Sequence, residues 1–399
     1  MGRKLRVAVI GGGIGGLTAA RALQLRGFDV RVYESSPELK EIGAGVALGP
    51  NAMKALRSLD LEDQVRAIGY QSKFQHLRTW KGRLISKTDA SVTAQRFGAR
   101  ACTIHRADLL DVLARSVPSE VVTLSARCEA VTTDGSVPAA RFTDGTQIEA
   151  DMIVGADGIH SAVRESLFGP DAPRFTGKIC YRSVIAVADL PQQSIEPYEG
   201  LWLGPHGTIV IYGVRRGELI NVVAHYDDAT YQHESWIAEC DRGEILDRYR
   251  RWHASLQEVF ETGKTWYKWA LYDRDPTPAW TKGLATVLGD AAHPMLPYLG
   301  QGAGQAMEDG CVLAAALDRL AEDPAGALAL YESSRRPRAS RVVLTSRERG
   351  NDNHLVSPLA ALARDVRIAV RKRFCTDVTG RGEAWIAEYD AGSPTVLAG

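Results

Sequence analysis

The stretch LRVAVIGGGIGGLTAARALQLRGFDVRVYE, residues 5–34, decides the fold of this chain. Its first part, residues 5–10, is an apolar run too short for a helix, which predicts a buried strand. Residues 14–26 then place apolar side chains at helical spacing until Gly27 supplies a stop, and residues 29–34 predict a second buried strand. A strand, a glycine-rich turn, a helix and a strand within about 30 residues form a βαβ unit. The chain therefore opens as an α/β protein with parallel strands.

The turn inside this unit carries the pattern Gly11-x-Gly13-x-x-Gly16, and Glu34 ends the second strand. The first glycine permits a tight turn, the second lets the backbone approach a pyrophosphate, and the third allows close packing of the helix. The helix N-terminus then faces the phosphates, and the carboxylate of Glu34 can accept hydrogen bonds from a ribose. A glycine-rich turn without a ligand is the alternative. The strand, helix and terminal acid together favour a dinucleotide-binding site.

The composition is that of a globular enzyme-sized chain. It has 399 residues, of which 45% are hydrophobic, and its 48 Lys and Arg balance 48 Asp and Glu. No net positive field exists to hold nucleic acid or an anionic membrane surface. The six cysteines show no CxxC or metal-ligand spacing. We therefore expect no metal site, no nucleic acid partner, and reduced thiols in a cytoplasmic protein.

The N-terminus imitates a secretory signal, because MGRKLR precedes an apolar run. Glycines interrupt that run and Arg21 follows soon after it, so the βαβ unit explains the sequence better. No other stretch is long enough and free enough of charge to predict a membrane span.

The rest of the chain contains segments of mixed helices and strands and one segment that is rich in strands. Helices are expected from Pro50 to Leu59 and after His105, a hairpin around the Asp-Gly at 144–145, and a strand running into a turn at 151–158. Residues from about 175 to 275 are rich in strands and aromatic side chains, which suggests an inserted sheet. The mixed pattern of strands and helices seen at the N-terminus returns near Leu284. The remaining expected elements are a strand at 286–294, a long helix from Gly300, and helices at 325–349 and 356–373.

These segments predict a Rossmann-like cofactor domain with an inserted β-rich substrate domain, of mixed α/β class. The cofactor domain is expected at 1–174, with some strands near 70–100 belonging to the substrate lobe, and again at 276–350. The substrate domain is expected at 175–275, and a C-terminal helical segment at 351–399.

Two distant segments indicate which dinucleotide is bound. Gly155-Ala156-Asp157-Gly158 with Ser161 and Arg164 resembles the second signature of the flavoprotein aromatic hydroxylases, and Gly289-Asp290 with Ala291-Ala292-His293-Pro294 resembles the third. His105-Arg106, Tyr331-Glu332 and the basic run 335–338 fit as well. From about Leu5 to Arg341 the chain resembles a salicylate-hydroxylase-like member of the para-hydroxybenzoate hydroxylase class of FAD-dependent monooxygenases.

The resemblance implies noncovalent FAD and assigns further cofactor residues. Asp290 would accept a hydrogen bond from a ribityl hydroxyl, Arg106 would reach the phosphate region, and Asp157 would contact cofactor. The alternatives are a turn cap for either aspartate and a solvated surface arginine. Gly300 and Gly302 begin the long helix, whose N-terminus can stabilise negative charge on the flavin ring; close helix packing is the alternative. Since no second GxGxxG exists, NADH or NADPH would bind transiently.

The implied reaction hydroxylates a small aromatic, such as a hydroxybenzoate, salicylate or hydroxypyridine, with O₂ through a flavin C4a-hydroperoxide. Tyr212 matches a family active-site tyrosine, although a place in the sheet core is the alternative. Several relatives carry histidine where this chain has Thr208, so their base cannot be transferred. His206 is a candidate base two residues earlier, with an ordinary loop histidine as the alternative.

Two more residues complete the predicted substrate site. Arg182 would neutralise a substrate carboxylate, unless it forms a surface ion pair, and Pro297 would contact the substrate.

Other functions stay open on the sequence alone. A non-catalytic flavin-binding regulatory protein or another flavin oxidoreductase is the main alternative. A flavin-dependent halogenase is disfavoured because its WxWxIP segment is missing, and an NAD-dependent dehydrogenase because of the two later FAD signatures. A homodimer is a further expectation. The ring, the position of attack, any decarboxylation, and NADH against NADPH are left undetermined.

Overall fold

The computed structural model describes residues 5–39, 43–135, 137–235, 237–374 and 381–397. Its N-terminal unit consists of β1 (Arg6–Ile10), α1 (Ile14–Leu25) and β2 (Asp29–Tyr33). The two strands pair in parallel, which confirms the expected βαβ unit. The apolar side chains of β1 are buried on both faces, as those of a central parallel strand should be.

This unit forms the middle of a six-stranded sheet. The strand order is β18-β19-β11-β1-β2-β7, and all neighbours are parallel except β18 and β19. The added strands are β7 (Val122–Thr123), β11 (Met152–Gly155), β18 (Thr281–Lys282) and β19 (Ala285–Val287). Ile10 pairs with Tyr33 on one side and Gly155 on the other. The carboxyl ends of these strands therefore meet at one edge, where open α/β sheets bind ligands.

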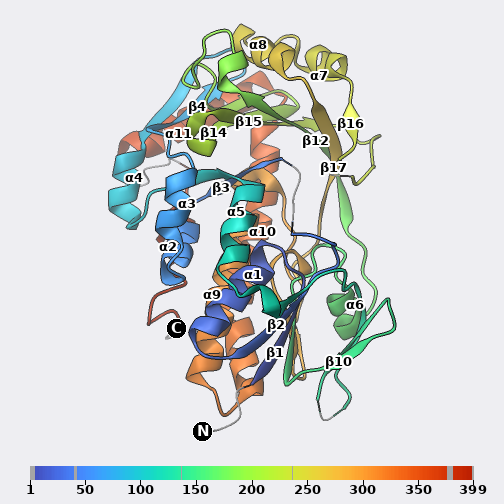
Figure 1. The fold of residues 1–399 in the computed structure, drawn as a ribbon. Coiled ribbons are helices and arrows are strands. Elements are labelled where there is room, and N and C mark those ends of the chain that lie inside the picture. The colour runs from blue at the N-terminus through green and yellow to red at the C-terminus, as the bar shows by residue number, and fades with distance from the viewer. Residues whose placement is uncertain (1–4, 40–42, 136, 236, 375–380, 398–399) are drawn as a thin grey trace.

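A second, eight-stranded sheet lies at the other end of the molecule (Figure 1). Its order is β16-β17-β12-β15-β14-β13-β4-β5, and only β13 and β4 are parallel. Its strands are β4 (Phe74–Thr79), β5 (Leu84–Asp89), β12 (Arg174–Ala186), β13 (Gly200–Gly204), β14 (Gly207–Val214), β15 (Leu219–Asp227), β16 (Glu239–Cys240) and β17 (Trp266–Asp273). The two-lobed mixed α/β fold is confirmed. The lobe boundaries expected at 174 and 275 stay predictions.

Helices α7 (Arg242–Tyr249) and α8 (Ala254–Thr262) cover one face of this larger sheet (Figure 1). Alternate residues of the strands, among them Ile209, Ile211 and Val222, form a buried apolar cluster with the two helices. The period of two then directs the intervening side chains to the opposite face, toward the smaller sheet.

Two long helices connect the two lobes. α9 (Gly302–Arg319) packs against α1 and against α2 (Pro50–Ser58), and α10 (Pro324–Asn353) continues toward the larger sheet (Figure 1). α9 begins at Gly302 rather than at the expected Gly300, because residues 297–299 form a separate 3₁₀ turn and Gly300 has a φ of 61°. α10 runs through Pro337 and ends beyond the expected residue 349.

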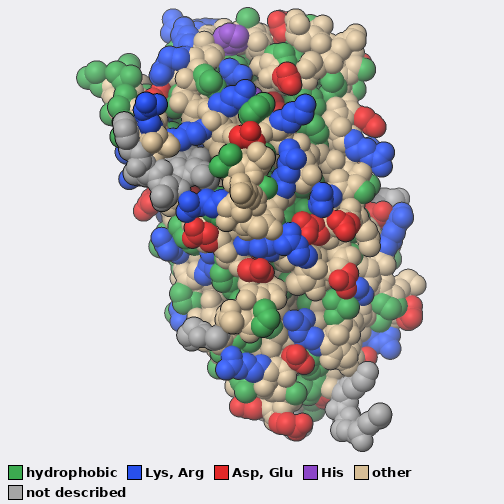
Figure 2. All heavy atoms as spheres, turned by 90° about the vertical axis from the view of Figure 1, so that its left-hand side faces the viewer, with side chains coloured by type: hydrophobic (Ala, Val, Ile, Leu, Met, Phe, Trp, Pro, Cys, Tyr) green, Lys and Arg blue, Asp and Glu red, His purple; other side chains and the backbone are tan. Residues whose placement is uncertain are grey.

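The remaining elements include a three-stranded sheet of β8, β9 and β10 and a two-stranded sheet of β3 and β6. They are β3 (Gly45–Leu48), α3 (Glu62–Ile68), α4 (Ala90–Phe97), β6 (Cys102–His105), α5 (Arg106–Arg115), β8 (Cys128–Thr132), β9 (Ala139–Phe142), β10 (Gln147–Glu149), α6 (Ala162–Phe168), α11 (Pro358–Phe374) and α12 (Ala384–Glu388). β9 and β10 form the hairpin that the Asp-Gly turn predicted. Basic and acidic side chains are interspersed over the face in Figure 2.

In the part of the chain that the structure describes, no helix combines the length and apolar character that a membrane crossing needs. Among the same residues, no three His, Cys, Asp or Glu side chains form a group that could hold a metal ion.

Candidate active site

One cavity of about 590 Å³ reaches from the glycine turn of the smaller sheet to the open face of the larger sheet. Many of the residues predicted for cofactor or substrate line it. These are Gly13, Arg106, Arg182, Tyr212, Asp290, Pro297, Gly300 and Gly302. The other predicted residues, Gly11, Gly16, Glu34, Asp157 and His206, do not line it.

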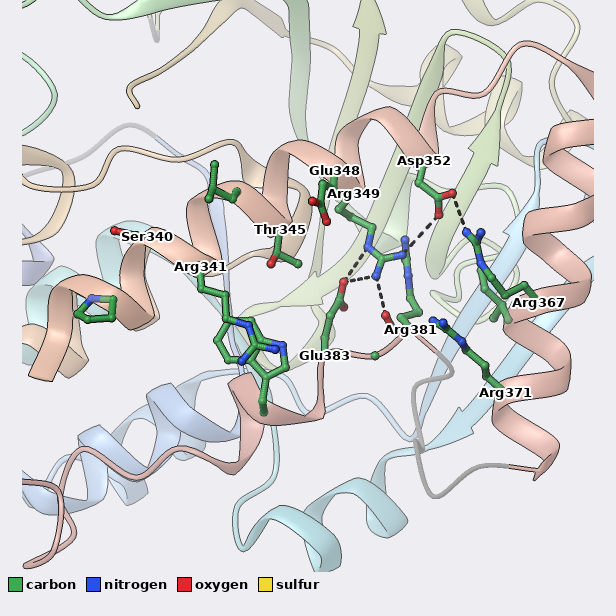
Figure 3. Close-up of a pocket in the computed structure, with 15 residues that line it drawn as sticks. Ser340, Arg341, Thr345, Glu348, Arg349, Asp352, Arg367, Arg371, Arg381 and Glu383 are labelled. Atoms are coloured by element: carbon green, nitrogen blue, oxygen red, sulfur yellow. Dashed lines mark hydrogen bonds and ion pairs between the residues drawn. The ribbon is translucent and has the colours of Figure 1, made fainter. Parts of the chain in front are cut away.

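A larger cleft, of about 910 Å³, lies between α10, α11 and the segment before α12 (Figure 3). Three arginines of this cleft have side-chain partners. Arg349 binds Glu383 and Asp352, and Arg367 binds Asp352 at 2.9 Å. Arg341 stacks over the ring of Trp385 at 3.9 Å. The pair of the exposed Arg367 with Asp352 contributes little energy.

The three fingerprint glycines have different surroundings. A Cβ on Gly11, whose φ is 108°, would lie 2.3 Å from the Ala156 carbonyl oxygen. A Cβ on Gly16 would lie 1.9 Å from the Gly11 carbonyl oxygen. A Cβ on Gly13 would meet nothing within 4 Å. Gly11 and Gly16 are therefore required by packing, whereas the space in front of Gly13 fits a pyrophosphate group.

Glu34 stands directly beside this turn, although it lies outside the cavity wall. Its carboxylate accepts hydrogen bonds from the backbone N–H of Gly12 at 2.6 Å and of Ser36 at 2.8 Å. The turn and the strand end are thereby fixed to each other. The ribose contact predicted for Glu34 stays a prediction.

Arg106 and Asp290 supply opposite charges to the cavity wall. Arg106 begins α5, and its backbone N–H donates to the Ala44 carbonyl at 2.7 Å. Burial lowers the pKa of Arg106, while the charge of Asp290 acts in the opposite direction. A half-buried guanidinium and an exposed carboxylate in one wall suit the phosphates and ribityl hydroxyls of FAD, respectively.

Asp157 also lies outside the cavity wall. Its carboxylate accepts hydrogen bonds from the Ser161 hydroxyl at 2.5 Å and from the Val163 N–H at 3.1 Å. It therefore fixes the start of α6 instead of reaching the cavity, which its neighbours Ala156 and Gly158 line. Burial raises the pKa of Asp157, and these hydrogen bonds oppose that shift. These hydrogen bonds are those that an Asp-Gly turn suggests, and the cofactor contact predicted for Asp157 stays a prediction.

A buried ionic network holds the Gly289-Asp290 loop in place. Asp309 of α9 accepts from the Gly289 N–H at 3.0 Å, from His293 Nε2 at 2.5 Å and from Arg335 Nε at 2.7 Å. Burial opposes ionisation of Asp309, but the charges of His293 and Arg335 outweigh it and lower the pKa to about 2. Arg335 also binds Glu308 at 2.5 Å.

His293 and Arg335 stand in motifs that carry the family resemblance, but the sequence did not predict their contacts with Asp309. Their separation along the chain hides the contact, because three different elements bring the groups together.

The open face of the larger sheet forms the inner part of the cavity. Thr208, Val210 and Tyr212 alternate along β14 and line it, as do Val223 and His225 of β15. The residues between them belong to the apolar cluster under α7 and α8. Tyr212 is thus on the cavity face, and not in the sheet core.

Tyr212 and Arg182 are positioned by their neighbours. Asn221, opposite Tyr212 in the β14–β15 register, accepts from the Gly45 N–H at 2.7 Å and joins β3 to the larger sheet. Burial raises the pKa of Tyr212, so the phenol is protonated at neutral pH. Arg182 is only 5% exposed, which excludes the surface ion pair, and its guanidinium carbon lies 4.9 Å from the centroid of the Trp269 ring.

His206 lies outside this cavity, so its predicted catalytic role gains no support from the geometry. The strand begins at Gly207, so His206 occupies the preceding turn with a φ of 60°. Its side chain is 49% exposed, and its Nδ1 lies 3.6 Å from Asp227. The prediction required β14 to extend to residue 206, and the tight β13–β14 turn prevents this.

His225 is the cavity residue that the sequence reasoning missed. It pairs with Thr208 in the β14–β15 register, and its Nδ1 lies 3.1 Å from the Thr208 hydroxyl. The signal was present, because a tight turn at 215–217 between two predicted strands places residues 208 and 225 opposite each other.

Comparison with known proteins agrees with this cavity. Residues 4–346 match the family described as FAD binding domain. The 3-amino-4-hydroxybenzoate 2-monooxygenase of Streptomyces platensis is 37% identical over 388 residues, covering 97% of this chain and 96% of that enzyme. The 6-hydroxynicotinate 3-monooxygenase of Pseudomonas fluorescens is 34% identical over 349 residues, covering 86% of this chain and 90% of that enzyme.

A solved structure extends the agreement to three dimensions. A salicylate hydroxylase in complex with its substrate superposes with a TM-score of 0.83 at 29% identity, covering 99% of this chain and 98% of the other. The match spans both lobes and hence the cavity between them. The chain belongs to the FAD binding domain family, and within that family it is an FAD-dependent aromatic monooxygenase.

Proposed function

We propose that this protein hydroxylates a small aromatic ring that carries both a hydroxyl group and a carboxylate, with NADH or NADPH and O₂ as co-substrates. One observation carries the proposal: a single cavity joins the pyrophosphate-sized space at Gly13 to an inner wall that holds Arg182, Tyr212 and Trp269. The names of the relatives, an aminohydroxybenzoate, a hydroxynicotinate and a salicylate monooxygenase, describe substrates of the same kind.

The cofactor end of the cavity is built for FAD, which supplies the oxygen-activating chemistry when it is bound and reduced. Gly13 leaves the phosphates room, Arg106 supplies a positive charge, and Asp290 supplies a hydroxyl acceptor. Gly300 and Gly302 bring the N-terminal N–H groups of α9 to the cavity. These N–H groups would stabilise negative charge on the ring system.

Arg182 gives the inner wall its selectivity for acids. Burial lowers the pKa of its guanidinium, which means that the surroundings disfavour the charge. A carboxylate placed beside it would offset this cost with a charge-assisted, bidentate contact. The adjacent Trp269 ring offers an apolar surface for a flat substrate.

Tyr212 would orient the ring. As a protonated phenol it donates a hydrogen bond to a substrate oxygen, which fixes the carbon to be hydroxylated at the cofactor end. Pro297 is the remaining proposed substrate contact, on the opposite wall. A phenolate ring is more electron-rich than a phenol, so removal of the substrate's hydroxyl proton should accelerate the reaction.

A panel of matched ligands tests this function. Salicylate, 3-hydroxybenzoate, 4-hydroxybenzoate and 6-hydroxynicotinate would each be compared with the same ring lacking the carboxylate or the hydroxyl group. NADH and NADPH consumption and product mass are recorded with the FAD-loaded protein. We expect the acids to yield a product 16 mass units heavier, or a hydroxylated product that has lost CO₂. A protein that turns over none of these rings contradicts the substrate class.

Arg182 allows a sharper version of the same test. Arg182→Met should weaken binding of the acids at least tenfold and leave binding of the rings without a carboxylate within twofold, because only the former need the positive charge. Arg182→Lys, which keeps the charge but loses the bidentate fork, should fall between. Equal losses for acids and neutral rings would show that Arg182 is structural.

The free thiols of Cys102, Cys128, Cys180, Cys240 and Cys311 support a reducing compartment such as the cytoplasm. A homodimer stays a prediction, to be measured by sedimentation of the FAD-loaded protein.

A further inference from the structure

We propose that Asn221 and Thr103 are positioning residues of the reaction, whose hydrogen bonds hold one wall of the cofactor end of the cavity at a fixed spacing from Tyr212. That wall is the ribbon formed by β3 and β6, which pair antiparallel. β3 lies between the two lobes of the molecule (Figure 1). The inference deepens the proposed function, since it rests on a substrate ring that Tyr212 orients toward the cofactor.

The β3–β6 ribbon forms part of the cofactor end of the cavity. Residues 44–47 line the cavity, and Arg106 follows β6 directly at the start of α5. The Arg106 N–H donates to the Ala44 carbonyl at 2.7 Å, which fixes the arginine to the wall. A displacement of the ribbon would therefore displace the positive charge that is proposed for the cofactor phosphates.

Asn221 connects this ribbon to the larger sheet. Its side chain is fully buried, and it stands directly opposite Tyr212 in the register of β14 and β15. Its Oδ1 accepts a hydrogen bond from the Gly45 N–H at 2.7 Å. Because a buried carboxamide cannot exchange this partner for water, the bond is costly to break. Asn221 therefore holds β3 beside the residue that is proposed to orient the substrate.

Gly45 brings the ribbon directly against the tyrosine ring. A Cβ on Gly45 would lie 2.6 Å from Tyr212 Cε2 and 2.7 Å from Asn221 Cβ. Carbon atoms that are not bonded to each other do not approach so closely, so β3 takes this place only because Gly45 has no side chain. The contact of backbone with ring sets the spacing between β3 and Tyr212, and the hydrogen bond to Asn221 maintains it.

Thr103 supplies a second connection, one residue beyond Tyr212. Its hydroxyl donates to the Gly213 carbonyl at 2.6 Å. Its backbone exchanges hydrogen bonds with Tyr70 at 2.7 and 2.9 Å, and a Cβ on Gly213 would lie 2.7 Å from the Tyr70 ring. Thr103 belongs to β6 and Gly45 to β3. Both strands of the ribbon are therefore bound to positions beside Tyr212.

The spacing decides whether oxygen reaches the aromatic ring. A displacement of about 1 Å can slow a reaction between two positioned groups about 100-fold. Coupled turnover converts the aromatic acid, O₂, NADH and a proton into the hydroxylated acid, NAD⁺ and water. Where the ring is not reached, the same O₂, NADH and proton leave as H₂O₂ and NAD⁺. A displaced ribbon should therefore change the division between product and peroxide more than the rate of NADH oxidation.

Hydrogen exchange of the FAD-loaded protein, read by mass spectrometry, tests the two connections without any turnover. Asn221→Leu keeps the size of the side chain but removes the acceptor, and should accelerate exchange in residues 43–48 about tenfold. Thr103→Val should accelerate exchange in residues 102–105, and Thr103→Ser, which keeps the hydroxyl, should restore the wild-type rate.

Ser183→Ala is the matched control. Ser183 is 1% exposed, and its hydroxyl donates to the Thr265 carbonyl at 2.8 Å within the larger lobe. Its loss removes a buried hydrogen bond that does not involve the β3–β6 ribbon. Exchange in both segments of the ribbon should therefore stay at the wild-type rate.

The same proteins, at saturating FAD, are then supplied in turn with salicylate, 3-hydroxybenzoate, 4-hydroxybenzoate and 6-hydroxynicotinate. Asn221→Leu and Thr103→Val should lower the product formed per NADH at least about threefold, with a matching rise in H₂O₂. Thr103→Ser and Ser183→Ala should keep the wild-type ratio. A merely structural role would lower the amount of active protein without changing this ratio.

The two measurements separate the possible failures. Wild-type exchange rates in Asn221→Leu and Thr103→Val would overturn the connections. Faster exchange with an unchanged ratio of product to NADH, or an equal fall of that ratio in Ser183→Ala, would overturn the positioning role but not the proposed function. A wild-type protein that hydroxylates none of the four acids would overturn the proposed function, and with it any role of the spacing in that reaction.

Discussion

The cleft beside α11 and the cavity between the two sheets differ in a way that size does not reveal. The cleft beside α11 is the larger, at about 910 Å³ against about 590 Å³, yet its Arg349 and Arg367 are paired with the carboxylates of Glu383 and Asp352. The smaller cavity brings together a glycine turn, charges of both signs and buried polar atoms that have no hydrogen-bond partner within the described part of the chain. Buried polar atoms without hydrogen-bond partners, and not a large volume, identify the site where a reaction takes place.

The largest difference between the two regions should appear in the free energy of unfolding. Arg335→Met removes the cation that faces Glu308 and Asp309, all three of which are fully buried. Breaking such a pair costs about 3–5 kcal/mol because it leaves buried charges uncompensated. Arg367→Ala in the cleft breaks an exposed pair and should cost about 0–1 kcal/mol. Urea unfolding of the FAD-free proteins measures both. Equal losses would remove the contrast between the two regions.

The next effect concerns cofactor content. Gly13→Val places a side chain in the open space where the pyrophosphate should lie, and should weaken FAD binding at least about 100-fold, or about 2.7 kcal/mol. Gly13→Ala should be intermediate. Ser340→Val adds similar bulk to the cleft and should retain wild-type flavin occupancy. The flavin absorbance of the purified proteins gives the answer, and a yellow Gly13→Val protein of normal affinity would place the phosphates elsewhere.

Acid stability sharpens the comparison further. Because the pKa of Asp309 is lowered to about 2 in the folded protein from an ordinary 3.8, this carboxylate stabilises the fold above pH 4. The contribution, of roughly 2 kcal/mol, is lost as the pH falls from 4 toward 2. Asp309→Asn should be less stable than wild type at pH 6, and the difference should shrink by pH 3. The uncharged cleft variant Thr345→Val should differ from wild type by the same amount at both pH values.

The smallest expected effect is that of a single cofactor contact. Asp290→Asn keeps the size but removes the charge that favours a hydroxyl donor, and should raise the FAD dissociation constant about tenfold, or about 1.4 kcal/mol. Glu348→Gln in the cleft should leave the constant unchanged. Flavin fluorescence titration of the apoproteins distinguishes the two. An unaltered constant for Asp290→Asn would mean that the residue acts only as a turn cap.

The sequence predicted those parts of the molecule that local patterns control. The spacing in residues 5–34 was sufficient for the βαβ unit, because a short buried strand, a glycine turn and an amphipathic helix each leave a local pattern. In the structure, the alternation along β14 places Thr208 and Tyr212 on one face. His206 shares that parity, and the prediction failed there because a tight turn ended the strand one residue earlier than required.

The contacts between distant segments could not be predicted in this way. Asp309 meets His293 and Arg335 only after α9 and α10 pack together, and Tyr298 meets His354 only at the end of α10. Asp157 is a further example, because its hydrogen bonds with Ser161 and Val163 at the start of α6 do not follow from the motif in which it stands. A motif indicates where the backbone runs, whereas the side-chain partner depends on packing.

The central claim is that the smaller cavity holds the flavin and the aromatic acid together, so that the acid controls flavin reduction. Anaerobic rapid mixing of the FAD-loaded protein with NADH, with and without salicylate or 3-hydroxybenzoate, tests it most directly through the loss of flavin absorbance. The account predicts that an aromatic acid accelerates reduction at least tenfold, that Arg182→Met loses this acceleration, and that Arg341→Ala in the cleft retains it. Rapid reduction by NADH alone, unchanged by every aromatic acid, would contradict it.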